Sequence, residues 1–224
     1  NLNMITEAIL SKIAPSLKGE RLAKYANGLD KICPQYGINS ADIMHEFLSN
    51  CLHESHEFTT LEEGMNYQSV ALQKLFSRKR ISMGDTINYG RTKTHAANKV
   101  MIANTIYGGE WGRINLGNVN PMDGWIFRGG SPIQITGRGN VTRFTNYYNA
   151  KTGSNYTPEQ MADLLKVDIE IGIHCACWIF AISFKLIDEA IDDKMNEVVK
   201  KINGGYIGMP DRLKYYELCK KYIV

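Results

Sequence analysis

The sequence has no long hydrophobic run, which limits the classes of protein it can represent. Its most apolar stretch, residues 171–184, is short and is interrupted by His174. A membrane-spanning helix needs about 20 consecutive apolar residues. We therefore predict no insertion into a membrane and a central buried helix at this position.

The chain also has no initial methionine and no basic segment leading into an apolar one, so no retained signal peptide is expected.

A large excess of charge of either sign is also missing. The 224 residues carry a formal net charge of +3, and 44% of them are hydrophobic, as in ordinary globular proteins. A mildly basic chain approaches anionic polymers easily, but its charge density is far below that of a nucleic-acid binder. We therefore expect no nucleic-acid partner.

Cysteines are few and lack the spacing of a disulfide framework. The five are Cys33, Cys51, Cys175, Cys177 and Cys219, an odd number, and three of them lie within apolar stretches. This pattern predicts buried free thiols and a fold that does not depend on an oxidising compartment.

Runs of strictly alternating apolar and polar residues, typical of β-strands, are short throughout the sequence. Helical periodicity dominates instead. The expected helices cover residues 2–14, 19–33, a segment from the capping residue Ser40 to Glu54, 69–76, 93–106, 159–165, 169–187, 189–202 and 210–222. Residues 107–132, rich in Gly and Asn, are expected to form a long loop. We predict a mostly α fold, a single domain over residues 1–224, with two lobes around a cleft bordered by loops 53–67 and 107–140.

Carboxylates gather where the third expected helix ends. Glu54 lies three residues after Cys51 and seven after Phe47, on or beside the apolar face, so its side chain should be partly buried. Burial disfavours the charged form of a carboxyl group, as a proton donor requires. Glu62 and Glu63 lie between threonines and Gly64, where a carboxylate stays solvated. Two glutamates in contrasting environments suit the acid and base of glycosidic hydrolysis, although such a cluster is also typical of a solvated surface.

The neighbouring histidines do not form a recognised metal motif. In the zincin motif the two histidines are four residues apart, whereas His53 and His56 are three apart and no third ligand is apparent. His174, Cys175 and Cys177 lie on an apolar helix and fit a core better than a ligand set. We expect neither a metal ion nor another cofactor.

Four sequence blocks are similar to those of a known enzyme family. They are HESHEFTTLEEGMNY (53–67), ANTIYGGEWGR (103–113), DGWIFRGGSPIQITGRGN (123–140) and INGGYIGMPDR (202–212). Their order and approximate spacing resemble the glycoside hydrolase family 19 catalytic domain over roughly residues 20–220, and its bacterial and phage endolysin branch more than plant chitinases. The resemblance implies a lysozyme-like helical fold with two lobes around a substrate cleft.

The resemblance also implies roles for individual residues. Glu54 corresponds to the general acid, and Glu63 corresponds to the base because Asn66 and Tyr67 fix the register that excludes Glu62. Thr136 takes the place of the hydroxyl that orients the attacking water. The expected substrate-binding residues are Tyr67, Gln134, Asn140, Asn203 and Arg212. The implied mechanism is an inverting single displacement, for which the two carboxyl groups stand roughly 6.5–9.5 Å apart.

The chain departs from the family pattern in two places. His56 and Glu57 replace the small residues that follow the His-Glu-Ser block in many relatives, and an Arg-Gly-Arg-Gly run appears as residues 128–131, Arg-Gly-Gly-Ser. The first places a bulky, chargeable pair beside the acid, and the second removes a positive charge from the cleft wall.

Peptidoglycan and chitin share a β-1,4-linked backbone of N-acetylated aminosugars. The Ile-Thr-Gly-Arg-Gly-Asn run after Gln134, the absence of the plant disulfide pattern and the basic balance favour peptidoglycan. We predict an endolysin-type or lysozyme-type glycosidase, a monomer made in the cytoplasm of a bacterial host and acting on the wall after release. The alternatives are a chitinase, a lytic transglycosylase, which the second glutamate disfavours, and a catalytically silent wall-binding module.

The aromatic residues Tyr67, Trp111, Trp125 and Phe127 fit sugar stacking and loop packing equally well.

Overall fold

The computed structural model describes residues 3–224, whose regular structure is almost entirely helical. Within this range, strand pairing is limited to isolated bridges, Glu62 with Gly130, Gly130 with Ile135, and Gln68 with Arg91. The prediction of a mostly α fold is therefore confirmed.

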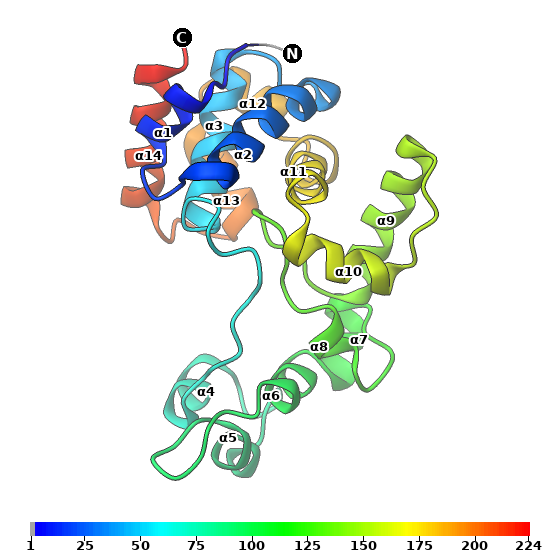
Figure 1. Cartoon of the computed structure of the whole chain (residues 1–224). Helices are drawn as coiled ribbons and strands as arrows, with labels where there is room; N and C mark the ends of the chain where they lie inside the picture. Colours follow the sequence, from blue (N-terminus) through cyan, green and yellow to red (C-terminus); the bar gives the residue numbers. More distant parts are fainter. Residues whose placement is uncertain (1–2) are drawn as a thin grey trace. The chain divides into compact units, whose positions relative to one another are not determined.

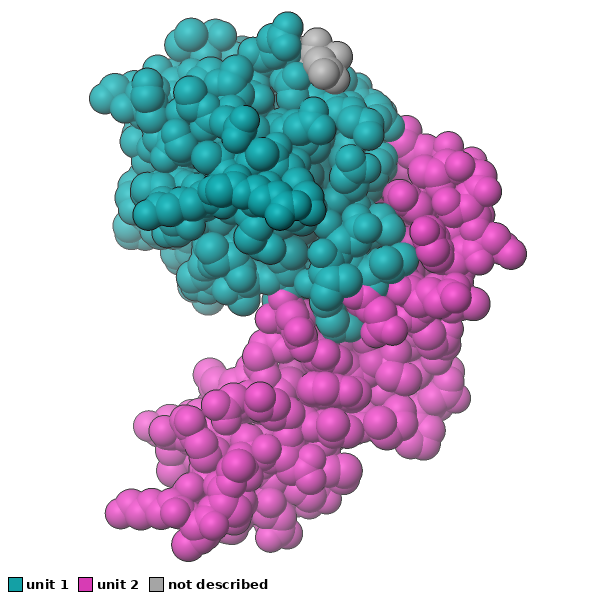
Figure 2. Space-filling model, viewed as in Figure 1, with its two compact units in different colours: residues 1–61, 131–134, 164–224 teal, residues 62–130, 135–163 magenta. Residues whose placement is uncertain are grey.

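The chain divides into two compact units, coloured separately in Figure 2. Unit 1 comprises the residues up to Leu61, Ser131–Gln134 and Leu164–Val224, and unit 2 comprises Glu62–Gly130 and Ile135–Asp163. Each unit is thus built from separate stretches of sequence. The prediction of a single domain stays a prediction.

The helices are labelled in Figure 1. Those of unit 1 are α1 (Glu7–Ile13), α2 (Gly19–Ile32), the 3₁₀ turn η1 (Cys33–Tyr36), α3 (Ala41–Glu54), α11 (Ile169–Trp178), the π-helical turn η2 (Ile179–Ser183), α12 (Ile187–Ile191), α13 (Met195–Asn203) and α14 (Met209–Tyr222). Those of unit 2 are α4 (Ser69–Leu75), α5 (Met83–Tyr89), α6 (Lys99–Ile106), α7 (Gly109–Leu116), α8 (Asp123–Ile126) and α9 (Arg138–Thr152). Helix α10 (Pro158–Val167) begins in unit 2 and ends in unit 1.

Helix α3 is the central element of unit 1. The hydroxyl of Ser40 accepts a hydrogen bond from the amide of Ile43 at its N-terminus, as the sequence predicts. Every residue from Ile43 to Leu52 is buried, because α12, α13 and α14 pack around the helix. Figure 1 shows α14 beside α1, so the first and last helices of the chain both belong to this core.

The apolar stretch 171–184 forms α11 and η2, buried over most of its length against α2 and η1. No helix within residues 3–224 has both the length and the apolar character that crossing a bilayer requires. All five cysteines are buried free thiols, as predicted; the Cys33 and Cys177 sulfurs lie 3.8 Å apart.

Unit 2 has its own apolar core. It consists of Met65, Leu72, Ile81, Ile102, Ala103 and Ile106, with the rings of Tyr67, Phe76, Tyr89, Tyr107 and Trp125 packed against it. Several aromatic residues around this core therefore contribute to packing in the unit that carries Glu63.

Several boundaries differ from the predictions. The expected loop 107–132 contains α7 and α8, and α5 and α9 were not predicted. Helix α9 escapes detection because only Val141, Phe144 and Thr145 are buried along its fifteen residues. The helix expected over 93–106 starts at Lys99, because the side chain of Asn98 caps it. The helix expected over 189–202 is split, and Asp193 has a positive φ of 53° at the break.

Candidate active site

Glu54 lies at the C-terminal end of α3 in unit 1, with its side chain 25% exposed. Arg212 of α14 donates to it from Nη2, and donates from Nη1 to Oδ1 of Asn50 over 2.6 Å. Asn50 lies one helical turn before Glu54, so the guanidinium spans one face of α3. Arg212 is only 1% exposed. The residue expected to bind sugar therefore holds the carboxyl group of the expected acid.

The turn after Glu54 has an unusual backbone. His56, Glu57 and Phe58 have φ values of 48°, 60° and 61°, in the left-handed region that disfavours residues with a Cβ. Glu57 accepts hydrogen bonds from the Ser16 amide over 2.9 Å and from the Tyr215 hydroxyl over 2.8 Å. The Phe58 ring stacks on that of Tyr25 at 4.3 Å. The surrounding structure of unit 1 thus holds this strained turn in place.

His53 contacts a carboxylate, with Nδ1 lying 2.8 Å from Oδ2 of Asp211. His56 is exposed. Across residues 3–224, no three His, Cys, Asp or Glu side chains are grouped so that they could hold a metal ion.

Glu63, the expected base, lies in unit 2 and accepts hydrogen bonds at both oxygens. Tyr107 donates its hydroxyl to Oε1 over 2.5 Å, and the Gly129 amide donates to Oε2 over 2.9 Å. The backbone amide of Glu63 donates in turn to the Gly129 carbonyl over 2.9 Å. Burial and the neighbouring Glu63 raise the pKa of Tyr107 well above its usual range, so this hydroxyl acts as a donor.

The adjacent Glu62 has a different environment. Its side chain is 49% exposed and pairs with Arg128, whose guanidinium also stacks on Trp125 at 3.6 Å. Glu63 instead receives a hydrogen bond at each carboxylate oxygen, from Tyr107 and from the Gly129 amide. The two glutamates, indistinguishable by local sequence, are therefore distinct in the structure.

Arg80 is the cation near Tyr107 and Glu63. Arg80 donates from Nε and Nη2 to the Ile106 carbonyl over 3.0 and 2.7 Å, and its guanidinium lies 3.6 Å from the centre of the Trp111 ring. Burial lowers the pKa of Arg80, while Tyr107 and Glu63 act in the opposite direction. Arg80 thereby supplies positive charge beside the tyrosine and carboxylate.

The backbone segments that carry Thr136 and Glu63 both pair with residues 129–130. Gly130 exchanges hydrogen bonds with Ile135 over 3.0 and 3.2 Å and forms a bridge with Glu62. The segments that carry the expected base and the expected water-orienting hydroxyl therefore lie on either side of Gly130. The Thr136 carbonyl accepts a hydrogen bond from Nδ2 of Asn140 over 2.8 Å, so the Asn140 amide supports this segment.

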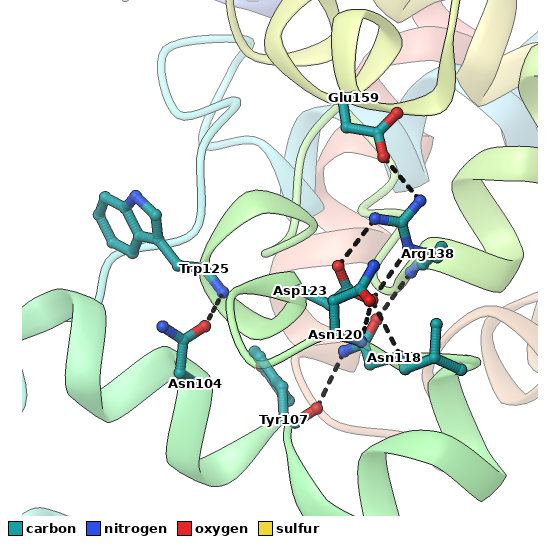
Figure 3. A network of polar contacts seen from close by, with 9 residues as sticks. Asn104, Tyr107, Asn118, Asn120, Asp123, Trp125, Arg138 and Glu159 are labelled. Carbon is teal, nitrogen blue, oxygen red and sulfur yellow. Dashed lines mark hydrogen bonds and ion pairs between the residues drawn. The ribbon is translucent and has the colours of Figure 1, made fainter.

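Figure 3 shows a network of polar contacts in unit 2. Asp123, which is fully buried, accepts from the amides of Val119 and Asn120 and from Nε and Nη2 of Arg138 over 2.9–3.0 Å. Arg138 donates from Nη1 to Glu159 over 2.7 Å. The network fixes the loop that leads through α8 to Gly129.

The same network reaches Tyr107. Asn118 accepts from the Arg138 amide over 2.8 Å and donates from Nδ2 to the Tyr107 carbonyl over 2.9 Å, as Figure 3 shows. Asn104 accepts from the Trp125 amide over 2.8 Å. Both donors to Glu63 are thus connected to one set of buried polar contacts.

The remaining expected binding residues make none of these hydrogen bonds to the two glutamates. Gln134 is exposed in the short stretch of unit 1 between the two parts of unit 2. Asn203 ends α13 before Gly204, which has a positive φ of 76°. The Nδ2 of Asn203 is buried and has no hydrogen-bond partner among residues 3–224. Tyr67 is half-buried and packs edge-to-face on Phe76.

Sequence reasoning missed Tyr107, Gly129, Asn50 and Arg80 as partners of the two glutamates. Tyr107 and Gly129 lie inside blocks similar to the family, but no residue spacing connects them to Glu63. Asn50 alone had a usable signal, since it precedes Glu54 by one helical turn.

Comparison with known proteins agrees with this fold. The chain is 30% identical over 214 residues to a glycosyl hydrolase family 19 domain-containing protein of Haemophilus influenzae, covering 95% of this chain and 94% of that protein. Chitinase C from Streptomyces griseus has a similar fold, with a TM-score of 0.58 and 13% identity over 98% of this chain and 76% of that one. A glutamate-to-glutamine mutant of chitinase C gives 0.59 and 11%, with the same coverage. No protein-family model matches the chain.

The chitinase C structures support the fold alone, because their sequence identity is low. The Haemophilus protein matches nearly the whole of both chains at 30% identity. On this evidence the chain belongs to glycosyl hydrolase family 19 and is a glycosidase.

Proposed function

We propose that the protein hydrolyses β-1,4 bonds between the N-acetylated aminosugars of bacterial peptidoglycan by an inverting mechanism. Glu54 acts as the general acid, Glu63 as the general base, and Thr136 orients the attacking water. The observation that carries the assignment is the distinct set of donors around each carboxyl group. Arg212 bonds Glu54, whereas Tyr107 and Gly129 bond the two oxygens of Glu63.

In the proposed reaction, Glu54 donates a proton to the glycosidic oxygen as the bond between that oxygen and the anomeric carbon breaks. Glu63 accepts a proton from a water molecule, whose oxygen forms the new bond to the anomeric carbon from the opposite face. The anomeric configuration inverts and no covalent intermediate forms. Arg212, Tyr107 and Gly129 orient the carboxyl groups and do not themselves transfer protons.

Peptidoglycan is favoured by the Ile-Thr-Gly-Arg-Gly-Asn run at 135–140 and by the excess of basic residues in unit 2. Unit 2 contains twelve Lys and Arg against seven Asp and Glu, which suits a wall polymer bearing carboxylates. Chitin is the second candidate, because the two solved structures compared above are named chitinase C.

The proposal includes an endolysin-like place of action. The protein is made in a bacterial cytoplasm and reaches the wall after release, acting there as a monomer. Competent residue types at Glu54, Glu63 and Thr136 support an active enzyme over a silent wall-binding module. The second carboxylate supports hydrolysis over a lytic transglycosylase reaction.

Digestion of purified peptidoglycan and of chitin oligomers, with mass analysis of the products, tests the reaction and the substrate together. We expect soluble fragments from peptidoglycan, hydrolysed reducing ends and an inverted anomeric centre. Anhydro-sugar products would indicate a transglycosylase, and cleavage of chitin alone would establish the second candidate. Binding to peptidoglycan without cleavage would identify a silent module.

A further inference from the structure

Positive charge is concentrated in one short part of unit 2. Residues 70–99 contain seven Lys and Arg and a single acidic residue, Asp85, although the whole chain has a net charge of only +3. Within the described residues, the side chains of Lys74, Lys79, Arg91, Lys93 and Lys99 form no ion pair. Unpaired charge of one sign attracts a partner of the opposite sign.

Two of these cations border a groove between α4, α5 and the loop that follows α5. We call it the stem groove; it has a volume of about 560 Å³ and is lined by Gln68, Ser69, Val70, Ile87, Arg91, Thr92 and Lys93. Val70 and Ile87 are 55% and 50% exposed. Its volume lies within the range of about 300–1,000 Å³ typical of ligand sites. Its walls therefore combine aliphatic surface with two free positive charges.

The loop that presents the cations is held firmly. The Arg91 amide donates to the Tyr67 carbonyl over 2.8 Å, and the Ser69 amide donates to the Arg91 carbonyl over 3.1 Å. A Cβ on Gly90 would lie 2.6 Å from the Cα of Ser69, so only glycine permits this approach. The groove is thus fixed to the backbone of residues 67–69.

Lys93 follows in a tight turn. The Thr92 hydroxyl accepts hydrogen bonds from the amides of Thr94 and His95 over 3.2 and 3.3 Å, and the Thr92 amide donates to the His95 carbonyl over 3.0 Å. These bonds fix the backbone on both sides of Lys93, while its exposed ammonium stays available to a ligand.

The groove lies close in sequence to the proposed base. Gln68 is five residues after Glu63 in the same unit, a separation that spans at most about 18 Å of extended chain. A glycan strand bound at Glu63 therefore has its side groups within reach of the groove. Peptidoglycan differs from chitin in carrying short peptides with free carboxylates and aliphatic side chains.

We propose that the stem groove binds the acidic peptide of peptidoglycan, with Arg91 and Lys93 pairing with its carboxylates and with Val70 and Ile87 contacting its aliphatic part. This inference rests on the proposed peptidoglycan hydrolase function. It makes the groove the feature of unit 2 that distinguishes a peptide-bearing glycan from a bare one. Binding at a lipid surface fits less well, because Val70 and Ile87 line a hollow, whereas interfacial binding needs a projecting apolar face.

The test compares two double variants on two substrates. Arg91→Gln with Lys93→Gln removes both cations of the groove, and Lys74→Gln with Lys99→Gln removes the same charge from outside its lining. The substrates are intact peptidoglycan strands and the same strands after an amidase has removed the peptides. We expect the groove variant to raise KM about tenfold on intact strands, with kcat unchanged, and to match the wild type on peptide-free strands. The control variant should match the wild type on both.

Titration of the free peptide released by the amidase gives a readout that needs no turnover. We expect wild-type protein to bind it and the groove variant to lose binding. If the wild type binds the peptide but cleaves neither strand, the proposed function fails and the groove remains a peptide site. If the wild type cleaves both strands and the two double variants behave alike, the groove proposal is overturned and the hydrolase stands. A third outcome would also overturn the groove proposal: the wild type binds phosphatidylglycerol vesicles but not the peptide, and the groove variant does not bind the vesicles. The groove would then be a site for a lipid surface.

Discussion

The Tyr107 hydroxyl donates to the carboxylate of Glu63 over 2.5 Å, from the helix end that also packs on the core of unit 2. A partly buried phenol with a raised pKa remains a donor across the physiological pH range. The contact therefore fixes one oxygen of the proposed base, while the Gly129 amide fixes the other.

Tyr107→Phe removes this donor and keeps the ring. A hydrogen bond to a charged group contributes about 1.5–3 kcal/mol, so we expect kcat/KM on peptidoglycan to fall roughly tenfold to a hundredfold. Tyr89→Phe is the matched control, since Tyr89 packs against the same core. Equal kinetics for the two variants would show that the Tyr107 contact does not orient the base.

Asp123→Asn should destabilise unit 2. The fully buried carboxylate is held by Arg138 and two backbone amides, and removing one partner of a buried ion pair costs about 3–5 kcal/mol. Urea unfolding measures the loss. Asp163→Asn, at an exposed position of the same unit, should leave the free energy of unfolding nearly unchanged. A similar small effect for both variants would contradict the role given to the network.

His56→Gly should stabilise the protein. His56 has a φ of 48°, which costs a residue with a Cβ about 1–2 kcal/mol and costs glycine little. The gain is partly offset by the greater freedom of glycine in the unfolded chain. We expect Tm to rise by about 2–4 °C in calorimetry. An unchanged or lower Tm would mean that the exposed imidazole makes a compensating contribution.

Glu46 should make stability depend on pH. Its side chain is fully buried on α3 and has no hydrogen-bond partner in the described chain. Burial is the main cause that raises its pKa to about 8, and the negative charges of Asp193 and Glu197 add to the shift. Tyr216 of α14 also faces it. The folded protein therefore keeps a proton that the unfolded chain releases near its ordinary value of 4.5. Stability should fall as pH rises from about 4.5 to about 8, by at most about 1.4 kcal/mol per pH unit, and then level off.

Glu46→Gln keeps the neutral shape and removes the titration. Urea unfolding at several pH values between 5 and 8 should show a flatter dependence in this variant and greater stability than the wild type at pH 8. The same slope in both proteins would assign the pH dependence to other groups.

Much of unit 1 was predictable because its helices carry local signals. Ser40 caps α3, and Gly204 ends α13 in the left-handed conformation. Unit 2 was less predictable. Helix α7 lies between glycines, and the polar α9 buries too few residues to show a helical period.

The candidate site shows the same division. The helical period alone places Glu54 at the edge of a buried face, and the structure leaves its side chain 25% exposed. The choice of Glu63 over Glu62 came only from family resemblance, since the features that separate them, Tyr107 and Arg128, lie more than forty residues away. For Arg212, family resemblance predicts a contact with sugar. Its contact with Glu54 joins residues 158 positions apart, so no local sequence pattern indicates it. Such contacts depend on tertiary structure and leave no local pattern.

The central claim is that Glu54 and Glu63 hydrolyse peptidoglycan as acid and base. The most direct measurement is digestion of purified peptidoglycan by wild type, Glu54→Gln, Glu63→Gln and Thr136→Ala, with product masses, the new anomeric configuration and the unfolding temperature of each protein. We predict inverted products from the wild type, no turnover by Glu54→Gln, and severe loss in the other two variants with their folding intact. Turnover by purified, folded Glu54→Gln at the wild-type rate would contradict the account.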